Sequence, residues 1–206
     1  MKLKSFLAGI LLLCSGVLSA QDWIDVTDAY VANPRFDGNS VEGWTLGGDA
    51  PTKATGYDGI EFFGGTFDIH QTLRVPAGKY RLSVQAYFRY TDNNRAYSAY
   101  KQGSDPKTAF LYANEVSQPV VSIYKESLGY YVSGAWNNDG VHYFPNNMES
   151  GSTFFAQGFY QNQMEVDVPV SCDLTFGLRC EEYYNDMWCM MDNFKLERYG
   201  VLLKVN

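Results

Sequence analysis

The sequence predicts an all-β fold, a β-sandwich of about eight to ten strands with one short helix. Three observations predict it. Short runs of alternating apolar and polar residues recur along the chain, and turn residues separate them. Tyr, Phe and Trp make up 16% of the residues, whereas only 19% of the residues are charged. Many aromatic residues together with 19 glycines are typical of folds built from short strands.

We interpret the first twenty residues as a secretory signal peptide, 1–20. Lys2 and Lys4 form a basic start, and the stretch 6–17 that follows is nearly all apolar. Ala20 then offers a small residue for cleavage. The apolar stretch is too short to span a membrane as a helix. We therefore expect a protein that is secreted, periplasmic or held at the cell surface.

Cys14 offers an alternative, which is a lipid anchor. Leu13 before it is large where a lipoprotein signal needs a small residue, so lipoprotein anchoring is the less favoured interpretation. We expect no transmembrane segment, because nothing later in the chain is apolar enough to cross a membrane.

The rest of the chain, 21–206, has the length of a single domain with a sizeable core. The formal net charge is −7, and it becomes −9 when Lys2 and Lys4 leave with the signal peptide. An acidic protein repels phosphate backbones, so we do not expect nucleic acid as a partner.

Three cysteines lie in this domain, and an odd number leaves at least one thiol unpaired or bonded to another molecule. Cys172 and Cys180 are at the two ends of one predicted strand, too far apart for a disulfide. Cys180 and Cys189 flank the segment 181–187, which we interpret as an acidic loop tip. A hairpin there would bring these two thiols together. The alternative is that all three are buried thiols that pack as small apolar residues.

The alternation predicts where the strands lie. They are expected at 67–75, 80–90, 108–113, 119–124, 163–168, 172–180 and 188–196. In the second of these, the even-numbered residues from Leu82 to Phe88 are apolar and are expected to face the core. Tyr87 and Arg89 therefore share the opposite face of that strand.

Two polar and irregular stretches, 92–107 and 125–143, are expected to be long loops. Asn146 and Glu149 have the spacing of a capping box, which predicts a short helix that ends before Gly158.

Segments near the two ends of the chain resemble a known family. The first reads Asn-Pro-Arg-Phe-Asp at 33–37, with Gly-Trp at 43–44, and the second reads Asp-Asn-Phe-Lys-Leu at 192–196. They resemble the opening and closing motifs of galactose-binding-like β-sandwich modules. These include many carbohydrate-binding modules and many domains of secreted proteins from gut-type bacteria. The resemblance implies a galactose-binding-like jelly roll in which the first and last strands lie side by side. Trp44 and Trp188 are expected to be core anchors.

The resemblance also implies a structural calcium ion. In that family an acidic residue from each end of the chain often holds one Ca²⁺, and this role falls on Asp37 and Asp192. Glu61 lies where several relatives place a third carboxylate. Ca²⁺ takes several oxygen ligands, which these residues would help to supply. The alternative is that Asp37 only caps a turn and Asp192 only ends a strand.

The expected ligand-binding surface combines aromatic rings with polar side chains, as sugar binding requires. Tyr87 and Arg89 share a face, and the family often has an Arg at the end of this strand. His70 is expected to join them from the neighbouring strand. The long loops add four rings at the rim of the site: Tyr97, Tyr100, Trp136 and Tyr143. The alternative is that these rings cover the sandwich without binding anything.

The sequence does not indicate catalysis. Neither His70 nor His142 belongs to a Ser or Cys motif, and no G-x-S-x-G, H-E-x-x-H or zinc-spaced cysteine cluster is present. We expect a secreted binding module that is not an enzyme, and carbohydrate, as a glycan or polysaccharide, is the first expected ligand. Two alternatives stay open: a protein–protein or cell-surface assembly module on the same scaffold, and a hydrolase with an unrecognised carboxylate pair.

Overall fold

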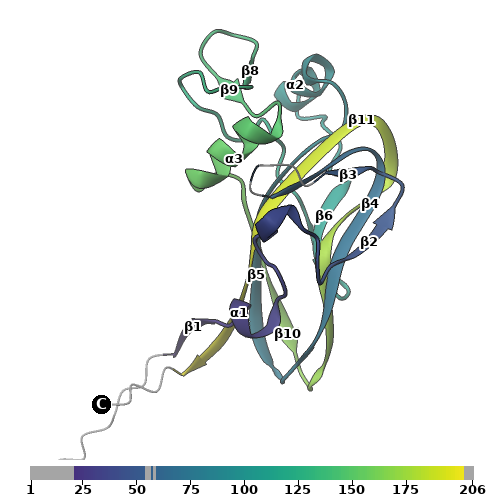
Figure 1. Ribbon diagram of the computed structural model, residues 1–206, viewed down its shortest axis with the longest axis vertical. Helices are drawn as coiled ribbons and strands as arrows, with labels where there is room; N and C mark the ends of the chain where they lie inside the picture. Colours follow the sequence, from purple (N-terminus) through teal and green to yellow (C-terminus); the bar gives the residue numbers. More distant parts are fainter. Residues whose placement is uncertain (1–20, 54–56, 58, 202–206) are drawn as a thin grey trace, which may run out of the picture.

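The computed structural model describes residues 21–53, 57 and 59–201, which form a β-sandwich with helices and loops at one end (Figure 1). The predicted all-β class is confirmed. The signal peptide predicted at 1–20, with the lipid-anchor alternative at Cys14, lies outside the described residues. Within the described ranges, no helix has the length and apolar character needed to cross a membrane.

The elements follow one another in the order β1 (Gln21–Asp25), α1 (Thr27–Tyr30), the 3₁₀ turn η1 (Asp37–Asn39), β2 (Thr45–Gly48), β3 (Thr52–Lys53), β4 (Ile60–Val75), β5 (Gly78–Arg89), α2 (Asn93–Lys101), β6 (Ala109–Ala113), β7 (Val116–Pro119), β8 (Trp136–Asn137), β9 (Tyr143–Phe144), α3 (Met148–Ala156), β10 (Gln161–Val168) and β11 (Cys172–Val201).

The two layers of the sandwich share their longest strand, β11. Its first part, 172–180, lies between β4 and β6, and β2 and β7 extend this layer at its two edges. Its later part, 188–198, pairs with β5 and with the start of β4, and β10 extends this layer beyond β5. The main core lies between the layers and is built from the inward-facing residues of both.

The segment 181–187 is not the loop tip that the sequence predicted. β11 continues through it, and its register against β4 shifts between Cys180 and Tyr184 and again between Tyr184 and Trp188. Such irregularities bend a strand and increase its twist. The arch of β11 in Figure 1 is this bend, and it carries the strand from one layer into the other.

The predicted alternative of a disulfide between Cys180 and Cys189 is wrong, because no hairpin brings them together. Cys172, Cys180 and Cys189 are all free thiols, and the last two are buried. Burial raises the pKa of the Cys189 thiol well above its ordinary value, so this residue packs as a neutral apolar group.

The two terminal motifs meet in the main core. Trp44 packs on Phe36 and Phe194, with ring centroids 5.3 and 4.6 Å away. Its indole N–H donates to the carbonyl of Asn33 at 3.1 Å, and the N–H of Phe194 donates to the carbonyl of Pro34 at 2.9 Å. In addition, β1 pairs with the end of β11. The expectation that the two ends of the domain lie side by side is confirmed.

The stretch 92–107, predicted to be a loop, contains the helix α2. The carboxylate of Asp92 accepts hydrogen bonds from the backbone N–H groups of Asn94 and Arg95, at 3.0 and 3.1 Å. This N-cap satisfies two donors that the helix itself leaves unpaired. The helix was missed because the asparagines and Ser98 are weak helix formers.

The predicted helix before Gly158 is confirmed as α3, with its start one residue later than expected. Asn147 is the N-cap, and its capping-box partner is Ser150 rather than Glu149. Gly158 ends the helix with φ of +82°, a conformation that glycine adopts at little cost.

A second cluster of buried residues lies outside the sandwich, on the outer face of β5 and β11. Its centre is formed by Tyr87, Trp188 and Met190 from these strands, together with Phe154 and Tyr160. The segments that cover it are α2, α3 and the connection 120–147, and we call these three together the cap. In Figure 1 the cap forms the upper end of the molecule.

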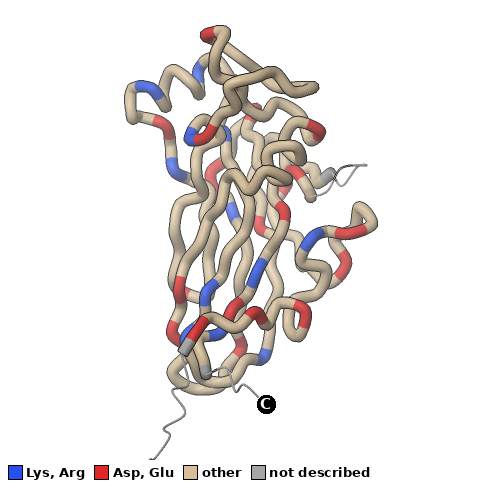
Figure 2. Tube along the Cα trace, turned by 90° about the vertical axis from the view of Figure 1, so that its left-hand side faces the viewer, with Lys and Arg blue, Asp and Glu red and all other residues tan. Residues whose placement is uncertain are grey.

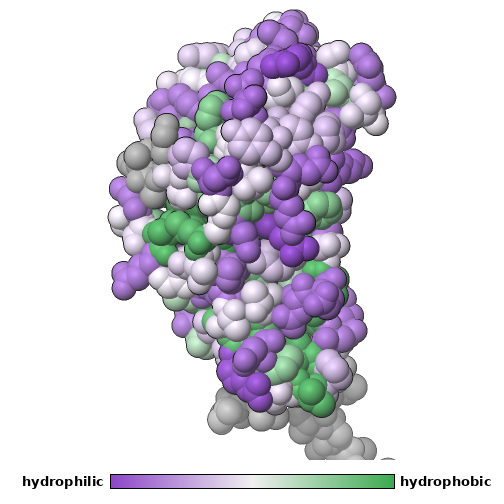
Figure 3. All heavy atoms as spheres, turned by 90° about the vertical axis from the view of Figure 1, so that its right-hand side faces the viewer, coloured by the Kyte–Doolittle hydropathy of each residue, from purple (hydrophilic) through white to green (hydrophobic). Residues whose placement is uncertain are grey.

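The side of the molecule that carries β2 is covered mostly by hydrophilic side chains, with apolar groups confined to a few patches (Figure 3). This is the usual character of a water-exposed sandwich surface.

Replacing Gly177 by Ala tests the close contact between β11 and its neighbour β4. Gly177 lies in β11 between His70 of β4 and Tyr112 of β6, and an added Cβ would collide with the carbonyl of Ile69 and come 2.9 Å from the Cα of His70. We expect G177A to lower the free energy of unfolding by about 3 kcal/mol or more in urea titrations. Gly129 has open space around it, so G129A should change stability by about 0.5 kcal/mol or less. Equal stability of the two variants would contradict this packing.

Candidate functional site

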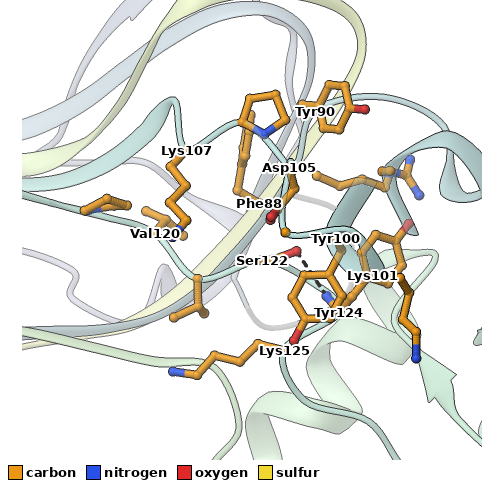
Figure 4. A pocket seen from close by; sticks show the side chains of 16 residues that line it. Phe88, Tyr90, Tyr100, Lys101, Asp105, Lys107, Val120, Ser122, Tyr124 and Lys125 are labelled. Atoms are coloured by element: carbon orange, nitrogen blue, oxygen red, sulfur yellow. Dashed lines mark hydrogen bonds between the residues drawn. The ribbon is translucent and has the colours of Figure 1, made fainter. Parts of the chain in front are cut away.

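A cleft of about 700 Å³ lies between α2, the segment that follows it, the end of β5 and residues 119–125 (Figure 4). This volume is within the range of small-molecule and oligosaccharide sites, roughly 300–1,000 Å³. The cleft is therefore large enough for at least one sugar residue.

Aromatic rings form much of the cleft wall. Tyr124 is buried, and its hydroxyl donates to the backbone and side-chain oxygens of Asn93 at 3.0 Å, which fixes the ring at the start of α2. Tyr100 packs against it with ring centroids 6.0 Å apart. Tyr90 packs its ring edge-on against Tyr184 at 5.8 Å. Tyr90 and Tyr100 are only partly buried, so part of each ring faces the cleft.

Arg89 also lines the cleft and is only 9% exposed. Its Nη1 donates to the side-chain oxygens of Asn93 and Asn146, at 2.6 and 3.3 Å. Its guanidinium lies over the ring of Trp188, 5.4 Å from the centroid. Burial lowers the pKa of Arg89, and its Nε finds no hydrogen-bond partner among the described residues.

Three lysines border the cleft from three different segments. Lys101 ends α2, Lys107 precedes β6, and Lys125 belongs to the cap connection. Figure 4 shows their side chains around the cleft, with Tyr100 and Tyr124 between them. The hydroxyl of Ser122 accepts a hydrogen bond from the N–H of Tyr124 at 3.4 Å. The cleft can thus offer rings for stacking and several charged or polar groups for hydrogen bonding.

Two residues predicted to bind ligand, Arg89 and the rim residue Tyr100, lie in this cleft. Tyr87 is not on an open face as expected. Tyr87 has no exposed surface, because the cap covers that face of the sheet. Its ring packs against Phe155, Tyr160 and Trp188 at centroid distances of 5.5, 4.9 and 5.1 Å. Burial raises the pKa of Tyr87 well above its ordinary value. Tyr87 is a core residue in this structure.

The other three predicted ligand-binding residues lie elsewhere. His70 is on β4 next to Gly177 of β11, in the other layer, with its Nδ1 3.2 Å from Asp68. Trp136 packs inside the cap against Tyr97, with ring centroids 5.5 Å apart. Tyr143 is partly buried and packs against the exposed ring of Tyr131, with ring centroids 5.9 Å apart. These residues do not form one surface with Arg89.

Of the residues that line the cleft, the sequence predicts Tyr100 and Arg89 but gives no signal for Tyr90, Tyr124, Ser122 and the three lysines. These residues come from segments that carry no common motif. Only the folding of the cap onto β5 brings them together, so no local sequence signal marks them as a group. The available sequence signal for the cleft wall was Asp92, the N-cap residue that precedes α2.

Two of the three predicted metal ligands lie together. Asp37 and Asp192 line one small pocket of about 190 Å³, so acidic residues from the two ends of the domain do meet. Arg35 lines the same pocket, with its Nε 3.5 Å from the carboxylate of Asp37. Glu61 does not join them, because its carboxylate accepts a hydrogen bond from the indole of Trp188 at 2.6 Å. Among the described residues, no three metal-ligating side chains form a group.

Comparisons with known proteins give similarity in structure only. No family model matches the chain, and no curated protein matches it. One similar structure is the TmCBM61 complex with β-1,4-galactotriose, with 14% identity, a TM-score of 0.41 and coverage of 82% of this chain and 97% of that one. Another is the enzymatically active domain of tailspike protein 4 of bacteriophage CBA120, with 12% identity, a TM-score of 0.40 and coverage of 84% and 21%.

A candidate sugar-binding protein from Bacteroides thetaiotaomicron is also similar, with 12% identity, a TM-score of 0.26 and coverage of 78% of this chain and 85% of that one. At these identities and TM-scores, none of the three similarities assigns a function to this chain. What this chain binds must therefore be argued from its own cleft.

Replacing Tyr87 by Ala separates a core role from a ligand-binding role. Because the whole ring is buried, we expect Y87A to lower the free energy of unfolding by about 3–5 kcal/mol. Tyr130 is an exposed ring in the cap, and Y130A should change stability by about 0.5 kcal/mol or less. Chemical denaturation followed by tryptophan fluorescence measures both. A Y87A protein as stable as the parent would place this ring on an open surface.

Proposed function

We propose that the chain is a non-catalytic carbohydrate-binding module that holds a glycan in the cleft beside α2. The observation that carries this proposal is the combination, in one cleft of suitable volume, of accessible tyrosine rings with fixed polar groups. Tyr90 and Tyr100 offer ring faces for the apolar side of a pyranose. Arg89 and Ser122 offer a donor and a hydroxyl for the polar groups of the sugar.

The carboxylates around the cleft support binding without turnover. Asp105 is the one Asp or Glu among the described residues that line it. Hydrolysis of a glycosidic bond ordinarily uses a pair of carboxyl groups on either side of that bond. A single lining carboxylate suits a residue that accepts hydrogen bonds from sugar hydroxyls.

The proposed module acts outside the cytoplasm, as the signal peptide predicted at 1–20 implies. There it would meet polysaccharides and glycans rather than nucleic acid, which its acidic net charge disfavours as a partner.

A structural calcium ion is a second part of the proposal. The support for it is that Asp37 and the buried Asp192 line one pocket although they come from opposite ends of the domain. A cation there would hold the loop that contains η1 against the last strand. It would have to displace Arg35 from Asp37, and the remaining oxygen ligands would come from backbone or water.

The glycan proposal is tested by binding of the purified protein to a broad glycan array and by titration calorimetry with the best ligand. Y100A removes a partly exposed ring of the cleft, and we expect it to weaken binding about tenfold or more. Y130A removes an exposed ring outside the cleft, and we expect it to leave the affinity unchanged. Retention of no glycan by the folded protein, or equal effects of the two substitutions, would contradict the proposal.

The calcium proposal is tested by thermal unfolding in 1 mM Ca²⁺ and in excess EDTA. A ligand at about one hundred times its dissociation constant stabilises a protein by about 2.7 kcal/mol, which raises the Tm of a chain of this size by roughly 5–10 °C. We expect D192N to abolish this difference and D173N, a change at an exposed acid on the far end of β11, to preserve it. Identical Tm values of the parent protein in the two buffers would overturn the proposal.

The alternative of a protein–protein or cell-surface assembly module has one specific observation in its favour. Tyr130, Tyr131 and Val141 of the cap connection are more than half exposed. Clustered exposed aromatic residues often mark an interaction surface. A folded protein that retains no glycan but self-associates in sedimentation experiments would move the conclusion to this alternative.

A further inference from the structure

The charge of the cleft is opposite to the charge of the protein. The full sequence carries a formal net charge of −7. Four cationic side chains nevertheless line the cleft, Arg89, Lys101, Lys107 and Lys125, against the one carboxylate of Asp105. In Figure 2 several Lys and Arg positions lie close together at the upper end of the molecule, where Figure 1 places α2.

The carboxylates of the described residues do not neutralise these cations. Asp92 and Asp186 are the acids whose charges act on Arg89. Both form ion pairs with Arg95 instead, and the distance from Asp186 to Arg95 is 3.5 Å. The ammonium of Lys101 lies 5.9 Å from the ring centroid of Tyr97, a contact that leaves its charge uncompensated. Within the described ranges, none of the three lysines has a carboxylate within ion-pair distance.

Arg89 gives the strongest reason to expect an anionic ligand. The side-chain oxygens that it binds belong to the amides of Asn93 and Asn146, which carry no charge. Arg89 is buried as a residue, so its guanidinium loses much of its hydration, and its Nε has no acceptor among the described residues. A carboxylate or sulfate group bound in the cleft would supply the counter-charge that the neutral amides do not.

We infer that the glycan held in this cleft is anionic, a sugar that carries a carboxylate, as in uronates, or a sulfate group. This inference rests on the proposed function, because the tyrosine rings supply the reason for a sugar and the cations supply the reason for its charge. A cleft in which positive charges outnumber negative ones focuses a positive field on its ligand, although the protein as a whole is acidic. The carboxylate or sulfate group is therefore what would distinguish the ligand from an uncharged sugar that is otherwise the same.

The test uses pairs of ligands that share one sugar backbone and differ in whether the anionic group is present. For the carboxylate the pair is tetragalacturonic acid and its fully methyl-esterified form. For the sulfate the pair is a κ-carrageenan oligosaccharide and its desulfated counterpart. We expect the charged member of one pair to bind the purified protein about tenfold or more tightly than its neutral member in 50 mM salt. We expect this preference to shrink in 500 mM salt, because ions screen exposed lysines.

Substitutions locate the effect. K101Q, K107Q and K125Q each remove one charge at the cleft, and we expect each to weaken binding of the charged ligand more than that of a neutral one. K79Q removes the same charge at the opposite end of β5, where Lys79 pairs with Glu165 at 2.5 Å, and should leave the affinity unchanged. An equal loss in K79Q would overturn the inference, because net charge rather than the cleft would then be responsible.

The outcomes separate this inference from the proposed function. Tight binding of a neutral glycan that depends on Tyr100, with no gain from a carboxylate or sulfate, overturns the inference and leaves the proposed function standing. Retention of neither charged nor neutral glycan overturns both. Preference for only one of the two charged ligands supports the inference and identifies the anionic group.

Discussion

Burial of the outer face of β5 and β11 is the constraint on which the rest of the structure depends. Tyr87, Trp188 and Met190 lie on that face. Burial of each large apolar side chain contributes about 1.5–3 kcal/mol to the free energy of unfolding. The helix α3 can approach because Gly151 faces them, where an added Cβ would collide with Met190 and Tyr87. Gln85 then ties the end of α3 to the sheet, with its amide donating to the carbonyl of Phe155 at 2.7 Å. The cap is thus a second hydrophobic layer and not a set of free loops.

The cap also builds the cleft. Tyr160 lies in the second cluster, and its hydroxyl donates to the carbonyl of Ile123 at 2.7 Å. Asn162 at the start of β10 accepts a hydrogen bond from the N–H of Val121 at 2.9 Å. These bonds hold residues 121–125 beside the end of β5, where Ser122 and Tyr124 become the wall opposite α2. Because the cap fills the outer face of β5 and β11, that face is closed to a ligand, and the proposed site lies beside α2.

Most of the long strands and the main core could be predicted from alternation, because period-two patterns and turn residues are local. The strand predicted at 119–124 is wrong, since β7 ends at Pro119 and the residues after it belong to the cap. The pairing of the chain ends could be predicted from the two terminal motifs, and it holds in the contacts of Trp44 with Phe194. Burial of the outer face of β5 and β11 by the cap could not be predicted. Tyr87 and Arg89 show the same alternation whether water or a cap covers them, so the pattern cannot distinguish a ligand surface from a second core. The bend at 181–187 was missed for a similar reason, since polar residues in a bent strand resemble a turn.

The claim that the binding site lies beside α2 and not on a sheet face is tested most directly by chemical-shift mapping with tetragalacturonic acid. The structure predicts shifted amide signals at Tyr100, Lys101, Ser122 and Lys125, with those of β4 around His70 unchanged. Shifts confined to the His70 face of β4, with none around α2, would contradict the account.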